Sequence, residues 1–178
     1  METIKVKDKV FEISITAKEI QLAIIKMALK IDEDLNGKNP LFLIVLNGAF
    51  VFAADLLRNI KMDCEVSFVK LSSYVGIQST NTVRELIGLD KALTGRTVVI
   101  VEDIIDTGVT MAHTLPKLKD LGAKDVKIAT LLFKPDAFKK SFKIDYIGME
   151  IKNDFIVGYG LDYDGFGRNY AEIYKIVE

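Results

Sequence analysis

The chain has 178 residues, enough for one domain with a substantial core and short for two. Its 24 Lys and Arg nearly balance its 25 Asp and Glu, so the overall charge gives no sign of binding to nucleic acid or to an anionic membrane. The single cysteine, Cys64, and the single histidine, His113, exclude an intramolecular disulfide and a histidine-rich zinc site, and we expect both residues to be structural.

The amino-terminal segment and the hydropathy of the chain bear on its location. The first residues alternate polar and apolar side chains and lack the apolar core of a signal peptide. No run approaches the ~18 uninterrupted apolar residues of a membrane-spanning helix. The sequence therefore predicts a cytoplasmic protein that forms a single domain over residues 1–178.

The first part of the chain alternates predicted strands with predicted helices. Residues 6–15 alternate in the manner of a half-buried strand. Thr16 and Glu19 have the spacing of a capping box, which predicts that a helix begins there. The apolar run 41–46 is typical of a strand covered on both faces, and a helix is predicted over about 49–60.

The same alternation continues through the middle of the chain. A strand is predicted over 66–71, followed by a long polar excursion, 72–89, with the composition of a mobile loop or hairpin. A strand over 97–101, a helix over 109–121 and a strand over 126–133 come next.

Two short strands, 146–150 and 155–158, are predicted in the last part of the chain, where glycine turns replace helices. The order of the elements predicts an α/β fold with a mainly parallel, twisted sheet flanked by helices. We expect a small hood built from the chain ends, namely the N-terminal strand and about residues 136–178.

The segment VVIVEDIIDTGVTM, residues 98–111, carries the strongest chemical signal. A strand of apolar residues leads into Glu102 and Asp103, and Asp106 follows just before a turn at Gly108. Ligands of open parallel sheets bind at the carboxyl ends of the strands, where these acids are expected. Two adjacent like charges at a strand tip cost stability unless something positive binds them, which favours a ligand site over a simple turn and helix cap.

The turn and the acids suit different chemical groups. N–H groups at the start of the following helix attract an anion, and Thr107 and Thr110 add hydroxyl donors. The carboxylates suit hydroxyl groups or a hard metal ion such as magnesium. A ribose 5-phosphate satisfies both halves of the segment. The glycine motifs of Walker-type and Rossmann-type nucleotide sites are absent.

Residues 98–111 resemble the phosphoribosyl pyrophosphate signature of the type I phosphoribosyltransferases. Within that superfamily the chain resembles the hypoxanthine-guanine phosphoribosyltransferases. Further segments carry this resemblance: VLNGAFVFAADL (45–56), LSSYVGIQST (71–80), Lys134 in LLFKPD, and the C-terminal stretch 145–169. The motifs occur in the order that they have in the family.

The resemblance implies a purine salvage enzyme that transfers 5-phosphoribosyl from phosphoribosyl pyrophosphate to hypoxanthine or guanine. The products would be IMP or GMP and pyrophosphate, the cofactor Mg²⁺, and the assembly a homodimer or homotetramer. Neither nucleic acid nor a membrane is an expected partner. A xanthine- or adenine-preferring relative, a non-catalytic phosphoribosyl-sensing regulator that binds RNA, and a response-regulator-like α/β domain remain alternatives, although the last does not explain the DTGVT turn.

The resemblance also assigns roles to individual residues. Asp106 matches the proposed general base of the family. The phosphoribosyl group and its phosphate would contact Glu102, Asp103, Ile104, Ile105, Asp106, Thr107, Gly108, Val109 and Thr110. Pyrophosphate would contact Asn47, Gly48 and Arg168. The purine subsite would comprise Lys134, Phe155, Ile156 and Asp162, metal ligands would be Glu102, Asp103 and Asp162, and Ser73 and Tyr74 would belong to a lid.

Physical reasons accompany three of these assignments. A lysine ammonium only donates hydrogen bonds, so Lys134 would favour a 6-oxopurine over adenine. A lid would protect the carbocation-like reaction centre from water. Many relatives carry Lys before Gly48 where this chain has Asn47, which removes a charge but leaves the backbone donors that a cis peptide exposes in the family.

Overall fold

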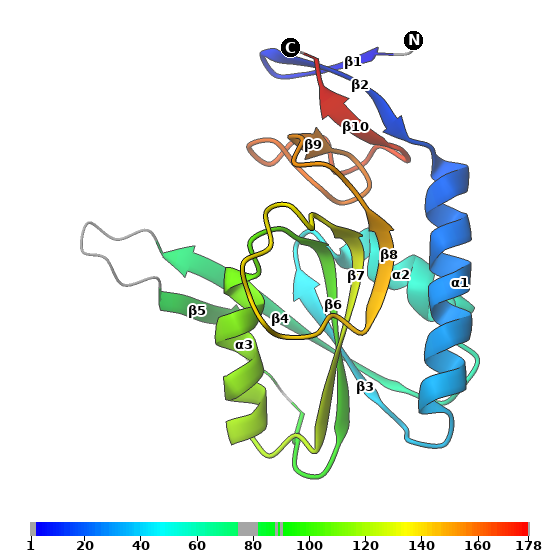
Figure 1. Ribbon diagram of the computed structural model, residues 1–178, viewed down its shortest axis with the longest axis vertical. Coiled ribbons are helices and arrows are strands. Elements are labelled where there is room, and N and C mark those ends of the chain that lie inside the picture. Colours follow the sequence, from blue (N-terminus) through cyan, green and yellow to red (C-terminus); the bar gives the residue numbers. More distant parts are fainter. Residues whose placement is uncertain (1–2, 75–81, 88, 90, 178) are drawn as a thin grey trace.

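The computed structural model describes residues 3–74, 82–87, 89 and 91–177. These residues form two sheets and the helices that flank them (Figure 1). In chain order the elements are β1 (Thr3–Val6), β2 (Lys9–Ile15), α1 (Ala17–Leu35), β3 (Leu41–Leu46), α2 (Phe50–Asn59), β4 (Glu65–Tyr74), β5 (Thr82–Ile87), β6 (Thr97–Ile105), α3 (Val109–Asp120), β7 (Asp125–Phe133), β8 (Tyr146–Glu150), β9 (Ile156–Val157) and β10 (Ile173–Ile176).

The larger sheet has six strands in the order β5-β4-β3-β6-β7-β8. Strands β4, β3, β6, β7 and β8 are parallel, and β5 is an antiparallel edge strand. The two central strands are buried along most of their length because both faces are covered. The predicted α/β fold with a mainly parallel sheet is confirmed.

The helices cover both faces of the larger sheet and so create two cores. Helices α1 and α2 pack on one face, where Phe42 and Val99 meet Ile24 and Phe52. Helix α3 packs on the other face (Figure 1), where its buried residues join a second apolar cluster. Consecutive residues of β3 and β6 point alternately into the two cores, which explains why these strands are continuous apolar runs.

The smaller sheet is antiparallel and combines both ends of the chain, in the order β1-β2-β10-β9. Figure 1 shows it at the top of the molecule, above the larger sheet and next to both termini. The predicted single strand 6–15 is instead a hairpin, because the chain turns at Lys7, whose φ is +54°. Strand β10 was not predicted, and β8 belongs to the larger sheet rather than to the hood.

Other boundaries also differ from the predictions. Strand β6 continues to Ile105, so Glu102 and Asp103 lie within the strand and not after it. In the 72–89 excursion, β4 extends to Tyr74 and pairs with β5 as a hairpin. The capping box at the start of α1 is confirmed, since Thr16 and Glu19 exchange the two expected hydrogen bonds.

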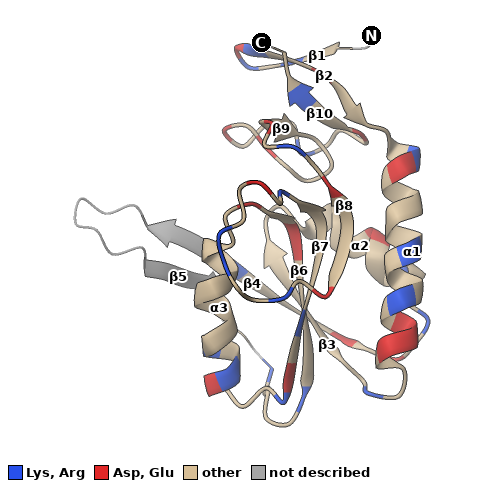
Figure 2. Ribbon diagram, in the orientation of Figure 1, with Lys and Arg blue, Asp and Glu red and all other residues tan. Residues whose placement is uncertain are grey.

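Helix α1 carries both signs of charge (Figure 2), with lysines in its middle and the acids Asp32, Glu33 and Asp34 at its end. Across the described ranges, no helix is both long enough and apolar enough to cross a membrane.

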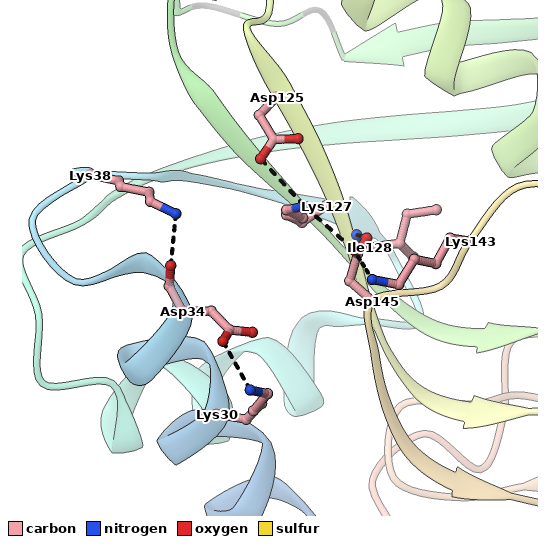
Figure 3. A network of polar contacts seen from close by, with 8 residues as sticks. All are labelled: Lys30, Asp34, Lys38, Asp125, Lys127, Ile128, Lys143 and Asp145. Carbon is pink, nitrogen blue, oxygen red and sulfur yellow. Dashed lines mark hydrogen bonds and ion pairs between the residues drawn. The ribbon is translucent and has the colours of Figure 1, made fainter.

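Figure 3 shows two groups of polar contacts: Asp34 of α1 with Lys30 and Lys38, and a network at the amino ends of β7 and β8. Asp145 is at its centre: the carboxylate accepts a hydrogen bond from the backbone N–H of Ile128 at 3.1 Å. The same carboxylate lies 3.6 Å from Lys127 Nζ and 3.4 Å from Lys143 Nζ. Asp34 on α1 pairs with Lys30 at 2.9 Å. This network lies at the end of the sheet opposite the acid-rich segment of β6.

Two substitutions of Asp145 separate its role as an acceptor from its role as a charge. Asp145→Ala leaves the buried Ile128 N–H without an acceptor and should lower the free energy of unfolding by about 1–3 kcal/mol. Asp145→Asn keeps an oxygen for that N–H and loses only partly exposed ion pairs, so it should cost less than about 1 kcal/mol. Urea denaturation measures both; equal losses would contradict the assignment.

Candidate active site

The site lies where the connections from two neighbouring strands diverge. The chain leaves β3 into α2 on one face of the sheet and leaves β6 into α3 on the other face. Pairing between β3 and β6 extends only to Ile44 and Val101, so the strand ends beyond this point are not joined. A parallel sheet has a crevice at such a topological switch point, and ligands bind there.

On the α3 side of the crevice, the turn after β6 encloses a cavity of about 110 Å³. Its lining residues are Glu102, Ile104, Ile105, Asp106, Thr107, Gly108, Val109, Thr110 and Met111. Gly108 is the N-cap of α3 with φ +77°, so the chain enters the helix through a conformation that glycine adopts without strain. The first N–H groups of a helix have no intrahelical acceptors, which makes this cavity suitable for a phosphate.

Residues 138–140, which no sequence pattern pointed to, pack against the outer side of this turn. A Cβ on Gly108 would lie 2.6 Å from the Phe138 ring and 3.1 Å from Cγ of Lys140. The backbone N–H of Lys139 donates to Thr107 O at 3.5 Å. Residues 138–140 therefore hold the turn in place, which only the three-dimensional contact reveals.

The two acids of β6 are buried in different surroundings. Oε2 of Glu102 is buried and has no hydrogen-bond partner in the described structure. Burial, and then the neighbouring Asp103 carboxylate, raise the pKa of Glu102 well above its usual value. Burial also raises the pKa of Asp103. Hydrogen bonds with Glu102 and with the Ile104 N–H, the latter at 2.9 Å, lower this pKa, but burial has the larger effect. A buried acid without a partner is expected where a polar ligand is missing.

Asp103 does not line the phosphate cavity, because its side chain lies against the loop after β3. A Cβ on Gly48 would be 1.6 Å from Asp103 Oδ2, so only glycine fits there. The peptide bond between Leu46 and Asn47 is cis, as in the family that the sequence resembles. The loop 47–49 and the acid pair therefore form two walls of one crevice.

The hood supplies a third wall. Nη1 of Arg168 donates to Gly160 O at 2.6 Å, and Nη2 lies 2.5 Å from Asp162 Oδ1. Asp162 also accepts from the Gly165 N–H at 2.6 Å. The positive charge of Arg168 is near enough to lower the pKa of Asp103, although burial dominates and the net shift is upward. The hood thus brings a guanidinium to the acid side of the crevice.

The predicted metal ligands do not form one cage. Among the described residues, no group of three or more His, Cys, Asp or Glu side chains is arranged to hold a metal ion. The orphaned Glu102 oxygen and the adjacent Asp103 still fit a Mg²⁺ ion that keeps several waters and takes other ligands from a substrate. Asp162 is engaged with Arg168 and lies apart from this pair.

The expected purine subsite is partly assembled. Lys134 is buried, its Nζ donates to Asp154 O at 2.9 Å, and it lies 3.5 Å from Asp106 Oδ2. The Phe155 side chain is 45% exposed, and its ring packs against those of Phe11 and Tyr163. A half-exposed ring on a firm support suits stacking on a planar base.

Ile156 is buried in the apolar core beside the small sheet, so only its backbone is available to a ligand. Ser73 and Tyr74 end β4. Their side chains, and the rest of the predicted lid over 75–81, lie outside the described residues.

This geometry suits a ligand with a phosphate and hydroxyl groups, and comparison with known proteins gives the family of the chain. The family model of the phosphoribosyl transferase domain matches residues 14–164. The chain belongs to the phosphoribosyltransferase family.

Its similar proteins include hypoxanthine-guanine phosphoribosyltransferases. The hypoxanthine-guanine phosphoribosyltransferase of Mycobacterium tuberculosis is 38% identical over 166 residues, which cover 89% of this chain and 82% of the relative. That of Lactococcus lactis is 44% identical over 138 residues, covering 77% and 75%. A crystal structure of a hypoxanthine-guanine phosphoribosyltransferase from Bacillus anthracis has a TM-score of 0.88 at 37% identity, covering 93% of this chain and 98% of that one.

Two glycines with left-handed backbones test the phosphate turn. Gly37 has φ +75° and open space around it, whereas Gly108 has φ +77° and abuts Phe138. Gly37→Ala should cost about 1–2 kcal/mol of stability through backbone strain alone. Gly108→Ala must also displace the turn, so we expect at least a roughly tenfold weaker affinity for ribose 5-phosphate by calorimetry. Equal affinities in the two variants would show that the turn does not bind the phosphate.

The buried Glu102 predicts a pH dependence of stability. Its pKa is raised in the folded state, so between the unfolded value of about 4.3 and the folded value the native protein holds the extra proton. Stability from this group is present at low pH and declines as pH rises. Glu102→Gln should therefore stabilise the free protein more at pH 8 than at pH 5, measured by thermal unfolding without divalent cations.

Glu33→Gln, at an exposed position of α1, is the matched control and should follow the wild-type pH dependence. A gain from Glu102→Gln that is independent of pH would contradict the role given to ionisation.

Proposed function

We propose that this protein transfers the 5-phosphoribosyl group of phosphoribosyl pyrophosphate to hypoxanthine or guanine, giving IMP or GMP and pyrophosphate in purine salvage. The observation that carries the proposal is the position of Lys134. Its ammonium is held by Asp154 O, and it lies next to Asp106 at the edge of the phosphate cavity. The names of the relatives support the same activity.

Different residues of the crevice bind different parts of the substrate. The turn over residues 107–110 binds the 5-phosphate, and the acid pair on β6 binds the ribose hydroxyls. Asn47, Gly48 and Arg168 bind the pyrophosphate through backbone donors and the guanidinium. Arg168 must leave Asp162 at least in part to do so, because their ion pair occupies the guanidinium edge in the free protein.

The base binds on the hood side of the same crevice. Phe155 stacks on the purine, the Ile156 backbone contacts its edge, and Lys134 donates to the oxygen at C6. Asp106, with a side chain 46% exposed, accepts the proton that the ring nitrogen loses as it bonds to the anomeric carbon. Ser73 and Tyr74 belong to the lid that keeps water from the reaction centre.

Mg²⁺ is the proposed cofactor. Glu102 and Asp103 would hold it through its water shell, and Asp162 would contribute at the pyrophosphate. The charge that it would supply there is positive, which would offset negative charge on the pyrophosphate. The support for this site is that Glu102 Oε2 is buried and has no hydrogen-bond partner among the residues that the structure describes.

We further propose that the chain forms a single domain, that it acts in the cytoplasm, and that it assembles as a homodimer or homotetramer. The support for a single domain is the sharing of the small sheet between both chain ends. The support for the rest is the resemblance to enzymes of nucleotide metabolism.

The direct test is a panel of hypoxanthine, guanine, xanthine and adenine with phosphoribosyl pyrophosphate and Mg²⁺, ranked by kcat/KM. We expect hypoxanthine and guanine to lead, and activity to be lost on chelation of the metal. Asp106→Asn should lower kcat by about 10²–10⁴, the usual contribution of a general base. The control Asp63→Asn changes an exposed acid at the amino end of β4 and should behave as wild type.

Two results would count against the proposal. Absence of nucleotide product with every base would refute the activity. Adenine leading the panel would refute the role of Lys134, because an ammonium has no acceptor for an exocyclic amino group.

A further inference from the structure

The loop 47–49, here called the pyrophosphate loop after the role proposed for it, contacts the hood without any space between the two backbones. A Cβ on Gly160 would lie 2.2 Å from Gly48 O, so the two glycines are in direct contact. On its other side, Gly48 supports the Asp103 side chain. The carbonyl of Gly160 accepts from Arg168, and its N–H donates to Arg168 O at 2.9 Å. A shift of Gly160 would therefore move the loop and Arg168 together.

Gly160 follows a residue with an unusual backbone. Tyr159 has φ +49°, which costs a non-glycine residue free energy and persists only where surrounding contacts impose it. Its side chain is 5% exposed, and its N–H donates to Tyr170 O at 2.9 Å. Its hydroxyl donates to the carboxylate of Asp55.

Asp55 connects this tyrosine to the body of the protein. It lies on α2, the helix that begins directly after the pyrophosphate loop, and its side chain is only 13% exposed. Besides Tyr159, the carboxylate accepts from Gln21 of α1 at 2.9 Å and pairs with Arg58. Burial raises the pKa of Asp55, but the hydrogen bonds from these groups outweigh burial and hold it below its usual value. The acceptor is thus ionised at neutral pH and held from three sides.

We infer that Asp55 is a positioning residue for the pyrophosphate subsite, acting through the Tyr159 hydroxyl. The bond fixes the hood segment that carries Gly160, Asp162 and Arg168 against the loop that begins α2. This inference rests on the proposed function, since it assigns the pyrophosphate subsite to that crevice. Neither Asp55 nor Tyr159 touches the substrate in this scheme.

The geometry predicts which kinetic constant depends on the bond. The glycine contact and Arg168 lie on the pyrophosphate side of the crevice, whereas Lys134 and Phe155 hold the base through contacts that do not involve Asp55. Loss of the Tyr159 hydroxyl should therefore weaken phosphoribosyl pyrophosphate and leave the affinity for the base unchanged.

The test compares wild type with Tyr159→Phe, with Asp55→Ala, which removes the acceptor that an asparagine would keep, and with the double variant. For Tyr159→Phe we expect the KM for phosphoribosyl pyrophosphate and the Kd for pyrophosphate to rise roughly tenfold, as small misplacements of binding groups do. The KM for hypoxanthine should stay within about twofold of wild type, a difference too small to indicate a lost contact. The double variant should be no worse than the more impaired single variant, since both changes remove one bond.

Two matched controls separate positioning from general stability. Arg58→Ala removes another partner of Asp55 but leaves the bond to the hood, and it should not alter either constant. Tyr146→Phe removes a hydroxyl from an equally buried tyrosine that hydrogen-bonds Asp34 at the far end of the sheet. It should lower the melting temperature without changing the KM for phosphoribosyl pyrophosphate.

Binding of pyrophosphate can be measured whether or not the protein has the proposed activity. If wild type makes no nucleotide, calorimetry with pyrophosphate and Mg²⁺ still compares the variants in binding alone. The inference would be overturned if Tyr159→Phe had a lower melting temperature but bound pyrophosphate with the affinity of wild type. It would also be overturned if Tyr146→Phe lost as much affinity for pyrophosphate as Tyr159→Phe.

Discussion

The contact between the Asp103 carboxylate and the backbone of Gly48 is the constraint around which the crevice is arranged. It brings the end of β6 against the loop that follows β3, although these two strand ends are no longer paired. No side chain larger than hydrogen fits between them, so the loop cannot move toward the acids without displacing Asp103. The backbone of Gly48 also contacts Gly160 of the hood. The backbone at this one position therefore connects the acid pair, the loop after β3 and the hood.

The electrostatics of the crevice follow from this arrangement. Two adjacent acids are removed from water in the free protein, and one carboxylate oxygen has no partner among the described residues. Such burial costs free energy that a polar or cationic ligand recovers. On the opposite side, the N–H groups at the start of α3 offer positive potential for a phosphate. The protein therefore separates positive and negative potential within one crevice, which suits a substrate that carries phosphates, hydroxyls and a metal ion.

Local sequence patterns predicted many of the helices, strands and turns. They did not predict the contacts between residues that are far apart in the sequence. The capping box at Thr16, the apolar run of β3 and the turn into α3 at Gly108 depend on neighbouring residues, so local spacing predicted them. The Tyr159–Asp55 bond joins residues 104 positions apart, and no periodicity signals it. Strand β10 was missed because it is short and pairs with the opposite end of the chain.

The predicted strand boundaries are wrong where pairing with a neighbouring strand extends a strand beyond its apolar run. Strand β6 continues past the predicted end because β7 pairs with it as far as Ile105. This extension places Glu102 and Asp103 inside a sheet, and it explains why they are buried more deeply than residues after a strand would be.

The network around Asp145 has a practical consequence for altering this protein. It lies at the amino ends of β7 and β8, whereas every residue proposed to contact substrate from the larger sheet is at or beyond the carboxyl ends of its strands. The contacts of Asp145 and the proposed ligand site thus lie at opposite ends of the strands of the larger sheet. Substitutions that add contacts around Asp145 would therefore act far from the proposed ligand site, and their effects on stability should add independently to the effects of changes in that site.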